Sequence, residues 1–498
     1  MVRVPLSFFL FCLFVCIQCD PQSEAKMESD YSLQTYFTLE GASLRGMKML
    51  PEGHLLVVKA DNKNGEADSD PDISGVEVLY DSDFDGISSE SVEIIKPGFR
   101  LSHGIEYVAP ENSWGDDMKG RILASSDSEV WAWPYNEGDK EVGTPQVMIE
   151  NINAADPPDT TQGHWTRTLR LSPDQRYLFV SVGSINNVDP NSFRARVRKF
   201  DLQSSEFMDN LPYDFTNGEV FANGLRNTVG TAFDQNGVLW GTDVGADNLN
   251  RADLGGDIHE YNPGEELNML GDGNGEGGNF YGYPYCWSEG YLPPGVGMGN
   301  GTIWAWPDSN STDMDEIDDD WCRQNSLKSQ LVMQAHSTPL GLVFNDVYQI
   351  VTPTSTLKCP AGVRFPRSSE GDAFVALHGS WNSPNPVGYE VVHIPFTIPG
   401  GLPTGEVFDL MKYKGPGAVW PSDVRPVDVT FDICGRLLVT DDGGGRIFTI
   451  SYRYPDDADD DDGLRPIWYI LIGYNALAML ACFIAIVYAQ IKANREPL

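Results

Sequence analysis

One pattern of residues recurs six times along this 498-residue chain: a polar start, a short apolar strand, a turn with Gly or Asp, and a second strand. The copies occupy residues 44–60, 101–126, 164–183, 226–245, 337–379 and 425–445. Their second strands begin roughly 55 to 70 residues apart, with one longer interval between the fourth and fifth copies, which is typical of β-propeller blades that carry loops. We therefore predict an all-β fold, a six-bladed β-propeller over residues 30–454. A pair of β-sandwiches, the alternative, would not require the same pattern six times.

Composition supports a folded body and excludes one class of partner. The chain is 41% hydrophobic and contains 50 Gly and 33 Pro, which suits many short strands joined by turns. Its formal net charge of −38 repels phosphate groups, so we expect no nucleic-acid partner. The long interval, residues 246–336, is rich in Gly, Asn and Pro and is expected to be an excursion over one face of the scaffold.

Both termini carry apolar runs that indicate a membrane topology. Residues 1–19 resemble a secretory signal peptide, with Arg3 before the apolar run. Residues 466–491 are long enough for a transmembrane helix. An acidic stalk, residues 455–465, precedes this helix and a basic tail, residues 492–498, follows it, so the tail is predicted to be cytoplasmic. We expect a single-pass type I membrane protein of the cell surface, tethered to the lipid bilayer, with an extracellular or lumenal propeller.

Cysteine usage agrees with an oxidising compartment. The predicted ectodomain keeps four cysteines, Cys286, Cys322, Cys359 and Cys434, which suggest two disulfides with three possible connectivities. A bond between Cys286 and Cys322 is preferred because both flank one loop-rich insertion; the other two would then pair or stay free. Two sequons, at Asn300 and Asn310, fall in the same insertion and predict a glycoprotein.

Polar residues recur at one register of the six copies. The innermost strand of each propeller blade lines the central axis, so residues at the starts of these strands should meet there. The residues that this alignment brings together are Arg45, His103, His164, Arg167, Arg226, Asn227, His336, Ser337 and Arg425. Arginines and histidines at one place predict a cationic funnel for an anionic ligand. Each residue alone would be interpreted as a solvated side chain or the partner of a nearby aspartate.

Five separated motifs carry a family resemblance. They read GHWTRTLRLSPDQRYLFVSVGS; FANGLRNTVGTAF with LWGTDVGADN; QAHSTPLGLVF; GDAFVALHGSWN with VGYEVVHIPF; and RPVDVTFDICGRLLVTDDGGGRIF. In this order, over most of residues 95–452, they resemble the glucose/sorbosone dehydrogenase family, six-bladed quinoproteins that use pyrroloquinoline quinone (PQQ). The resemblance implies a membrane-tethered PQQ-dependent oxidoreductase that oxidises a sugar or polyol hydroxyl and passes electrons to an acceptor that the sequence does not identify.

The resemblance also implies residue roles. His164 would be the general base, taking the hydroxyl proton as hydride passes to the quinone, and Arg226 would act with it. Main-chain carbonyls of Gly245 and Ala246 would hold Ca²⁺. The residues expected to bind the cofactor are Arg226, Asn227, Arg425, His336, His378, Trp381, Asn382, Arg167 and His103. Chemistry supports these roles, because a histidine of near-neutral pKa is a suitable base and planar arginines match carboxylates.

Three departures from the family pattern leave a second function open. Ser383 stands where relatives commonly have a basic residue, and Val229 and Val427 replace polar contacts. The alternative is a non-catalytic extracellular propeller that serves as a binding or receptor module. A calcium-dependent hydrolase ranks last, because it would need several Asn, Asp or Glu side chains at the axis, which the alignment predicts to be cationic.

Overall fold

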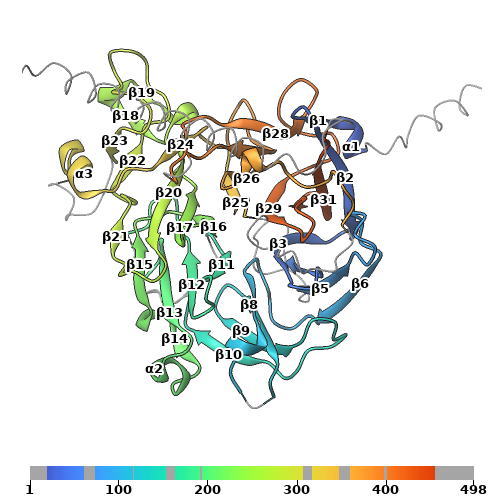
Figure 1. The fold of residues 1–498 in the computed structure, drawn as a ribbon. Helices are drawn as coiled ribbons and strands as arrows, with labels where there is room; N and C mark the ends of the chain where they lie inside the picture. Colours follow the sequence, from blue (N-terminus) through green and yellow to red (C-terminus); the bar gives the residue numbers. More distant parts are fainter. Residues whose placement is uncertain are drawn as a thin grey trace, which may run out of the picture.

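Six four-stranded antiparallel sheets stand around a central axis (Figure 1). The structure, a computed structural model, describes residues 20–60, 73–115, 117–152, 163–190, 193–306, 317–346, 359–397 and 401–454. Neighbouring inner strands pack against one another all the way round the ring. The predicted all-β six-bladed propeller is therefore confirmed.

The first three blades follow one another along the chain. Blade 1 contains β3 (Ser43–Met49), β4 (Leu55–Ala60), β5 (Gly75–Tyr80) and β6 (Glu90–Ile95). Blade 2 contains β7 (Ile105–Val108), β8 (Gly120–Ser125), β9 (Val130–Tyr135) and β10 (Gln146–Glu150), with β14 (Tyr213–Asp214) added at its edge. Blade 3 contains β11 (Arg167–Leu171), β12 (Tyr177–Val182), β13 (Arg196–Asp201) and β15 (Glu219–Asn223), with β21 (Asn279–Phe280) at its edge.

The last three blades complete the ring. Blade 4 contains β16 (Thr228–Phe233), β17 (Val238–Asp243), β20 (Glu265–Asp272) and β24 (Leu331–Met333). Blade 5 contains β25 (Pro339–Phe344), β26 (Ala373–Leu377), β27 (Glu390–Ile394) and β28 (Phe408–Tyr413), with β1 (Ala25–Met27) at its edge. Blade 6 contains β29 (Pro426–Phe431), β30 (Leu437–Asp441), β31 (Arg446–Tyr452) and β2 (Tyr31–Thr38).

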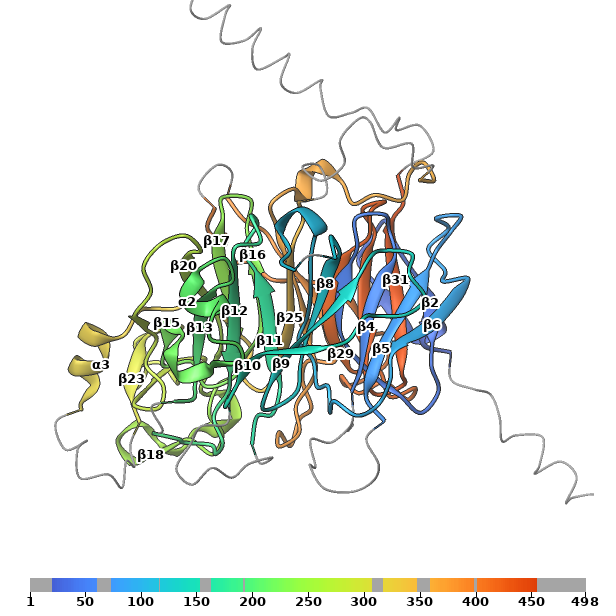
Figure 2. The ribbon, with the colours of Figure 1, turned by 90° about the horizontal axis from the view of Figure 1, so that it is seen from below.

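Blade 6 closes the ring by joining the two ends of the propeller. Strand β2 pairs antiparallel with β31 from Tyr31 opposite Tyr452 to Thr38 opposite Arg446. Figures 1 and 2 both show blue β2 beside red β31. The outermost strand of this blade therefore comes from the start of the chain and the other three from its end.

Short elements decorate the sheets. The long interval forms two small hairpins, β18 (Asn250–Arg251) with β19 (Gly256–Asp257) and β22 (Cys286–Ser288) with β23 (Ile303–Ala305), and helix α3 (Asp319–Asn325). The other helices are α1 (Pro21–Glu24), α2 (Ser205–Met208), and the 3-10 turns η2 (Pro110–Asn112), η3 (Phe215–Asn217), η4 (Ala252–Leu254), η5 (His259–Tyr261) and η6 (Arg367–Ser369). The predicted excursion thus lies at the outer side of blade 4 (Figure 1).

Two disulfides are present. Cys286 bonds Cys322 within the excursion, and Cys359 bonds Cys434. Both the preferred pair and the pairing of the remaining two cysteines are confirmed. The second bond joins a segment of blade 5 to the turn between β29 and β30 of blade 6.

The apolar core lies between neighbouring blades. Six clusters of buried side chains each join two adjacent sheets; one contains Leu123 and Val130 of blade 2 with Leu169 and Val180 of blade 3. Each such side chain stabilises the fold by about 1.5–3 kcal/mol through burial. Alternating apolar residues on the strands therefore fix both the sheets and the ring.

Below the starts of the inner strands, glycines let the backbones converge. Gly46, Gly104, Gly230 and Gly341 occupy one register, and a Cβ at Gly341 would lie 2.7 Å from the Cα of Asp428. The space left at this level has a volume of about 10 Å³, hardly enough for one water. The channel is closed here, so the site above has a floor.

Among the residues described, no helix is long and apolar enough to cross a membrane. The predicted signal peptide (1–19), stalk (455–465), transmembrane helix (466–491) and tail (492–498) lie outside the described residues. So does the sequon at Asn310, whereas Asn300 is exposed.

Candidate active site

All six inner strands run in the same sense, so their starts meet at one end of the axis. Two of these strand starts are held by the same kind of hydrogen bond. The backbone N–H of Arg226 donates to Asp243 Oδ2 at 2.9 Å, and that of Arg425 donates to Asp441 Oδ1 at 2.7 Å. Asp243 and Asp441 each end the second strand of their blade. A carboxylate on the neighbouring strand therefore fixes the turn that presents each arginine.

His164 is held in one tautomer. Its Nδ1 lies 3.0 Å from the carbonyl oxygen of Ser184 and 3.1 Å from that residue's hydroxyl. A carbonyl only accepts, so Nδ1 carries the hydrogen and Nε2 keeps its lone pair. Burial, together with the charge of Arg226, lowers the pKa of His164 to about 3, although the bond to Ser184 opposes the shift. The expectation of a near-neutral pKa is wrong, but the imidazole is unprotonated, as a base must be, at neutral pH.

Arg226 lies at the centre of a polar network. Its Nη2 is 3.1 Å from Asn187 Oδ1 and 3.2 Å from Asp247 Oδ2, and its Nε donates to the Asn187 carbonyl at 3.2 Å. Asn227, the next residue, donates its N–H to Asp243 Oδ1 at 2.8 Å. The guanidinium is thus fixed in direction while it remains close enough to His164 to act on its charge.

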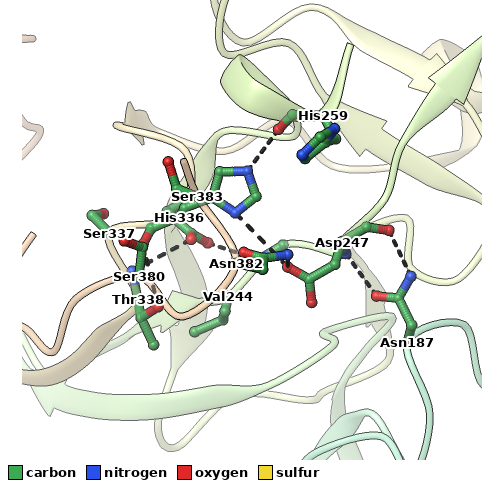
Figure 3. A network of polar contacts seen from close by, with 12 residues as sticks. Asn187, Val244, Asp247, His259, His336, Ser337, Thr338, Ser380, Asn382 and Ser383 are labelled. Carbon is green, nitrogen blue, oxygen red and sulfur yellow. Dashed lines mark hydrogen bonds and ion pairs between the residues drawn. The ribbon is translucent and has the colours of Figure 1, made fainter. Parts of the chain in front are cut away.

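Asp247 joins three parts of the propeller (Figure 3). Its Oδ1 accepts from Asn382 Nδ2 at 2.8 Å and lies 3.8 Å from His336 Nδ1. Its backbone N–H donates to Asn187 Oδ1 at 2.6 Å. His336 Nε2 in turn bonds the carbonyl of His259 at 2.6 Å. This one carboxylate therefore orients Arg226 of blade 4 and two polar side chains of blade 5.

A second network occupies the opposite side of the axis. Asp442 accepts from Arg45 Nη1 at 2.6 Å and from His378 Nε2 at 2.9 Å. The other ring nitrogen of His378 lies 3.2 Å from Arg425 Nη2 and accepts from it. Burial alone would raise the pKa of Asp442, but His378, Arg45 and Arg425 lower it to about 2. Asp442 is therefore an anion that holds two basic side chains in place.

The floor between the two networks is partly apolar. Val229, Val244, Leu340 and Val427 form one buried cluster. Two of them are the positions where sequence comparison expects polar contacts. Val229 and Val427 instead pack into this cluster and are 2% and 0% exposed.

The predicted cationic funnel needs correction. The axis carries Asp243, Asp247, Asp441 and Asp442 among its arginines, so its charge is mixed. These carboxylates were not predicted because they lie at or just after the ends of second strands, whereas the predicted residues lie at the starts of first strands. The repeated pair Thr-Asp at the ends of β17 and β30 was the signal that could have revealed them.

Arg167 is not available to a ligand in the way the sequence suggested. Its side chain is fully buried, and its Nη1 and Nε donate to the carbonyls of His164, at 2.7 Å, and Asp127, at 2.8 Å. Arg167 therefore holds the turn that carries His164. His103 is also buried, and burial with the nearby charge of Arg45 holds its pKa well below the usual value.

Gly245 and Ala246 follow β17 directly behind Arg226. The N–H of Gly245 donates to Glu265 Oε2 at 2.7 Å. Burial raises the pKa of Glu265 to about 8. The carbonyl oxygens of Gly245 and Ala246 accept no hydrogen bond from any residue in the described part of the chain. Both remain available to a ligand, and Glu265 is a further buried acid that sequence reasoning missed.

Comparison with known proteins identifies the family. The profile of the TrAA12-like family matches residues 25–453. The chain belongs to the TrAA12-like family. It is 31% identical over 386 residues to a PQQ-dependent sugar dehydrogenase of Hypocrea jecorina, covering 73% of this chain and 76% of that protein. It is 27% identical to a PQQ-dependent pyranose dehydrogenase of Coprinopsis cinerea, over 88% of this chain but only 56% of that protein.

Solved structures of TrAA12-like relatives agree. A calcium structure of Trichoderma reesei Family AA12 has a TM-score of 0.68 at 27% identity and covers 86% of this chain and 96% of that one. The holo PQQ domain of Coprinopsis cinerea pyranose dehydrogenase also has a TM-score of 0.68, at 25% identity, covering 86% and 97%. The predicted kinship with PQQ-dependent sugar dehydrogenases is confirmed.

The residues at the axis fit PQQ, the cofactor that these relatives are named for. Three buried polar atoms here lack a hydrogen-bond partner within the described residues: Arg45 Nε, His103 Nδ1 and Asn382 Oδ1. Leaving such groups unpaired costs about 1–3 kcal/mol each, so a ligand with carboxylate and carbonyl oxygens would stabilise them.

Proposed function

We propose that this member of the TrAA12-like family is a PQQ-dependent dehydrogenase of sugars or related polyols, with His164 as its general base. The observation that carries the proposal is the position of His164: Nδ1 is bound to Ser184, Nε2 accepts no hydrogen bond from any residue that the structure describes, and the ring lies near Arg226. A binding module has no need of an unprotonated base fixed beside a cation.

The two sides of the axis would bind different groups of the cofactor. Arg45, Arg425 and His378 would hold cofactor carboxylates on one side, and Arg226 with Asn227 would hold the quinone oxygens on the other. The free carbonyls of Gly245 and Ala246 would be ligands for Ca²⁺. When bound, PQQ supplies the acceptor for the hydrogen and electron pair that leave the sugar carbon.

The protein's own step is a proton transfer. His164 Nε2 takes the proton of the reacting hydroxyl as the alcohol becomes a carbonyl. The Ser184 carbonyl keeps the ring oriented by accepting from Nδ1–H, and Arg226 stabilises negative charge that develops on the oxygen. Arg167 holds the main chain of His164 from behind.

Reconstitution of the full-length protein with PQQ and Ca²⁺ tests this function. Dye reduction across a panel of aldoses and pyranoses should depend on the cofactor, and His164→Ala should lose at least about 100-fold in kcat/KM. His393→Ala is a matched control, because this histidine lies on β27, the third strand of blade 5, and is bound to Asp372. Absence of turnover on any sugar would support the binding-module alternative, whereas an active His164→Ala variant would show that His164 is not the general base.

We also propose that residues 466–491 tether the propeller to a membrane of the secretory pathway, with Asn300 glycosylated. The apolar run, its flanking charges and the two disulfides support this arrangement. The protein should resist alkaline carbonate extraction and become soluble when truncated after residue 454. Release of the full-length chain by carbonate would contradict the tether.

A further inference from the structure

Trp381 displays most of its indole at the mouth of the active site. The side chain is 75% exposed, which is uncommon for the largest apolar residue. Within the described residues it makes no contact with another aromatic ring or cation. The adjacent residue, Asn382, reaches Asp247 with its Nδ2 at 2.8 Å, so the exposed ring is connected directly to the network around Arg226.

The loop that carries Trp381 is stiff. Residues 383–386 read Ser-Pro-Asn-Pro, and both prolines fix a backbone dihedral. Ser383 Oγ donates to the carbonyl of Asn385 at 2.7 Å, and the backbone N–H of Val387 donates to Ser380 Oγ at 3.2 Å. The main chain that carries Trp381 is therefore ordered before a ligand arrives, which reduces the entropic cost of binding.

Two more exposed rings lie next to this loop. Asn385 Nδ2 donates to Glu260 Oε1 at 3.1 Å, which joins the loop to the turn at Tyr261. Tyr261 is 58% exposed and Tyr291 is 56% exposed, and their ring centroids lie 5.9 Å apart. Aromatic rings and amide or carboxylate groups therefore alternate along this edge of the mouth.

Such alternation matches the surface of a sugar. The C–H face of a pyranose packs on an aromatic ring, and its hydroxyls pair with amides and carboxylates. Asn382, the residue next to Trp381, is such an amide, and Asp247, to which its Nδ2 is bound, is such a carboxylate. Trp381 is linked to Arg226 through its neighbour Asn382 and Asp247, and a sugar ring stacked on it would differ from the one that reacts at His164.

We propose that Trp381, with Asn382 and the Tyr261–Tyr291 pair, forms a subsite for a second sugar unit, so that the preferred substrate is the end of an oligosaccharide. The proposal rests on the dehydrogenase function argued above. It assigns Trp381 to the carbohydrate rather than to the cofactor.

The experiment compares chain lengths. In the PQQ-loaded full-length protein, kcat/KM is measured for glucose, maltose, maltotriose, cellobiose and cellotriose. The kcat/KM for the best trisaccharide, divided by the kcat/KM for glucose, should fall about tenfold in Trp381→Ala, roughly the contribution of one aromatic contact. This ratio should recover in Trp381→Phe. Phe408→Ala, which removes an exposed ring on the outer strand β28, should leave the ratio unchanged.

Two further readouts separate the possible failures. Binding of the same trisaccharides to PQQ-free protein, followed by saturation-transfer NMR, should weaken in Trp381→Ala; this result supports the subsite even if no sugar is oxidised. PQQ affinity, followed by absorbance titration, should be equal in the wild type and Trp381→Ala. A large loss of PQQ affinity, or a ratio that does not depend on Trp381 in an active enzyme, would overturn the proposal.

Discussion

At the scale of single residues, the site depends on the protonation states of its side chains, and the surroundings of each side chain set its protonation state. His164 is unprotonated because burial and Arg226 disfavour its cation. Asp442 is ionised because two basic side chains bind it. Neither property can be deduced from the residue type, since both depend on neighbours from other blades.

The pKa of His164 gives a pH prediction. Because its folded-state pKa is lowered, the neutral form is present above about pH 3 and is lost only as the pH falls through that value. NMR titration of the PQQ-free protein should show no His164 transition near pH 6.5. Arg226→Gln should move the midpoint upward, by about one pH unit or less, since burial is the larger cause. A wild-type midpoint near 6.5 would contradict the arrangement.

Asp247 is the carboxylate on which the mouth of the site depends. Asp247→Ala removes one acceptor of Arg226 and the acceptor of Asn382 Nδ2, so kcat/KM should fall by about 10- to 100-fold, whereas Asp247→Asn keeps one oxygen and should lose less. Steady-state kinetics with a thermal melt separates this effect from unfolding. Asp409→Ala, on exposed β28, is the control. Full activity in Asp247→Ala would show that other contacts suffice to hold Arg226.

At the scale of elements, the close approach of the inner strands limits what can replace glycine. Strands β25 and β29 come so near that a Cβ at Gly341 would meet the main chain of Val427 and Asp428. Backbone held in a β-ladder cannot move aside as a side chain can. The floor of the site is therefore set by the absence of side chains at one register.

Gly341→Ala should lower the free energy of unfolding by about 1–3 kcal/mol, the usual cost of overpacking. Denaturant unfolding measures the loss. Gly275→Ala is a matched control, since its added Cβ would lie no closer than 3.2 Å to any neighbour. Equal stability of Gly341→Ala and Gly275→Ala would mean that β25 and β29 can move apart far enough to accept the added methyl group.

At the scale of the whole molecule, one covalent bond supports the junction of the last two blades. Cys359 and Cys434 are 75 residues apart in sequence, so their bond removes considerable freedom from the unfolded chain. The Cys359→Ser, Cys434→Ser double variant should be less stable by about 2–4 kcal/mol. Guanidinium unfolding without reductant measures this, with the Cys286→Ser, Cys322→Ser variant as a comparison that affects only the excursion. An unchanged midpoint would mean that non-covalent packing alone holds blades 5 and 6 together.

The sequence predicted the six-bladed architecture well because the same strand–turn–strand pattern occurs six times along the chain. It predicted residues on inner strands, such as His164 and Arg226, because repeats place them in one register. It could not predict that Asp243, Asp247 and Asp442 share the axis, since they lie at or after the ends of second strands, and Asp442 meets Arg45 only because the ring closes. Nor could it tell that Arg167 would point to main-chain carbonyls rather than toward the axis, because the alignment fixes a position along a strand but not the partners of its side chain.

The pairing of β2 with β31 also bears on synthesis of the chain. A ribosome makes β2 among the first strands and β31 among the last, more than 400 residues later. Until then β2 has an unpaired edge and blade 6 does not exist, although blades 1 to 5 can form in turn. Such an edge can pair with strands of other chains. During translation, folding of this protein therefore requires that β2 be kept from pairing with strands other than β31.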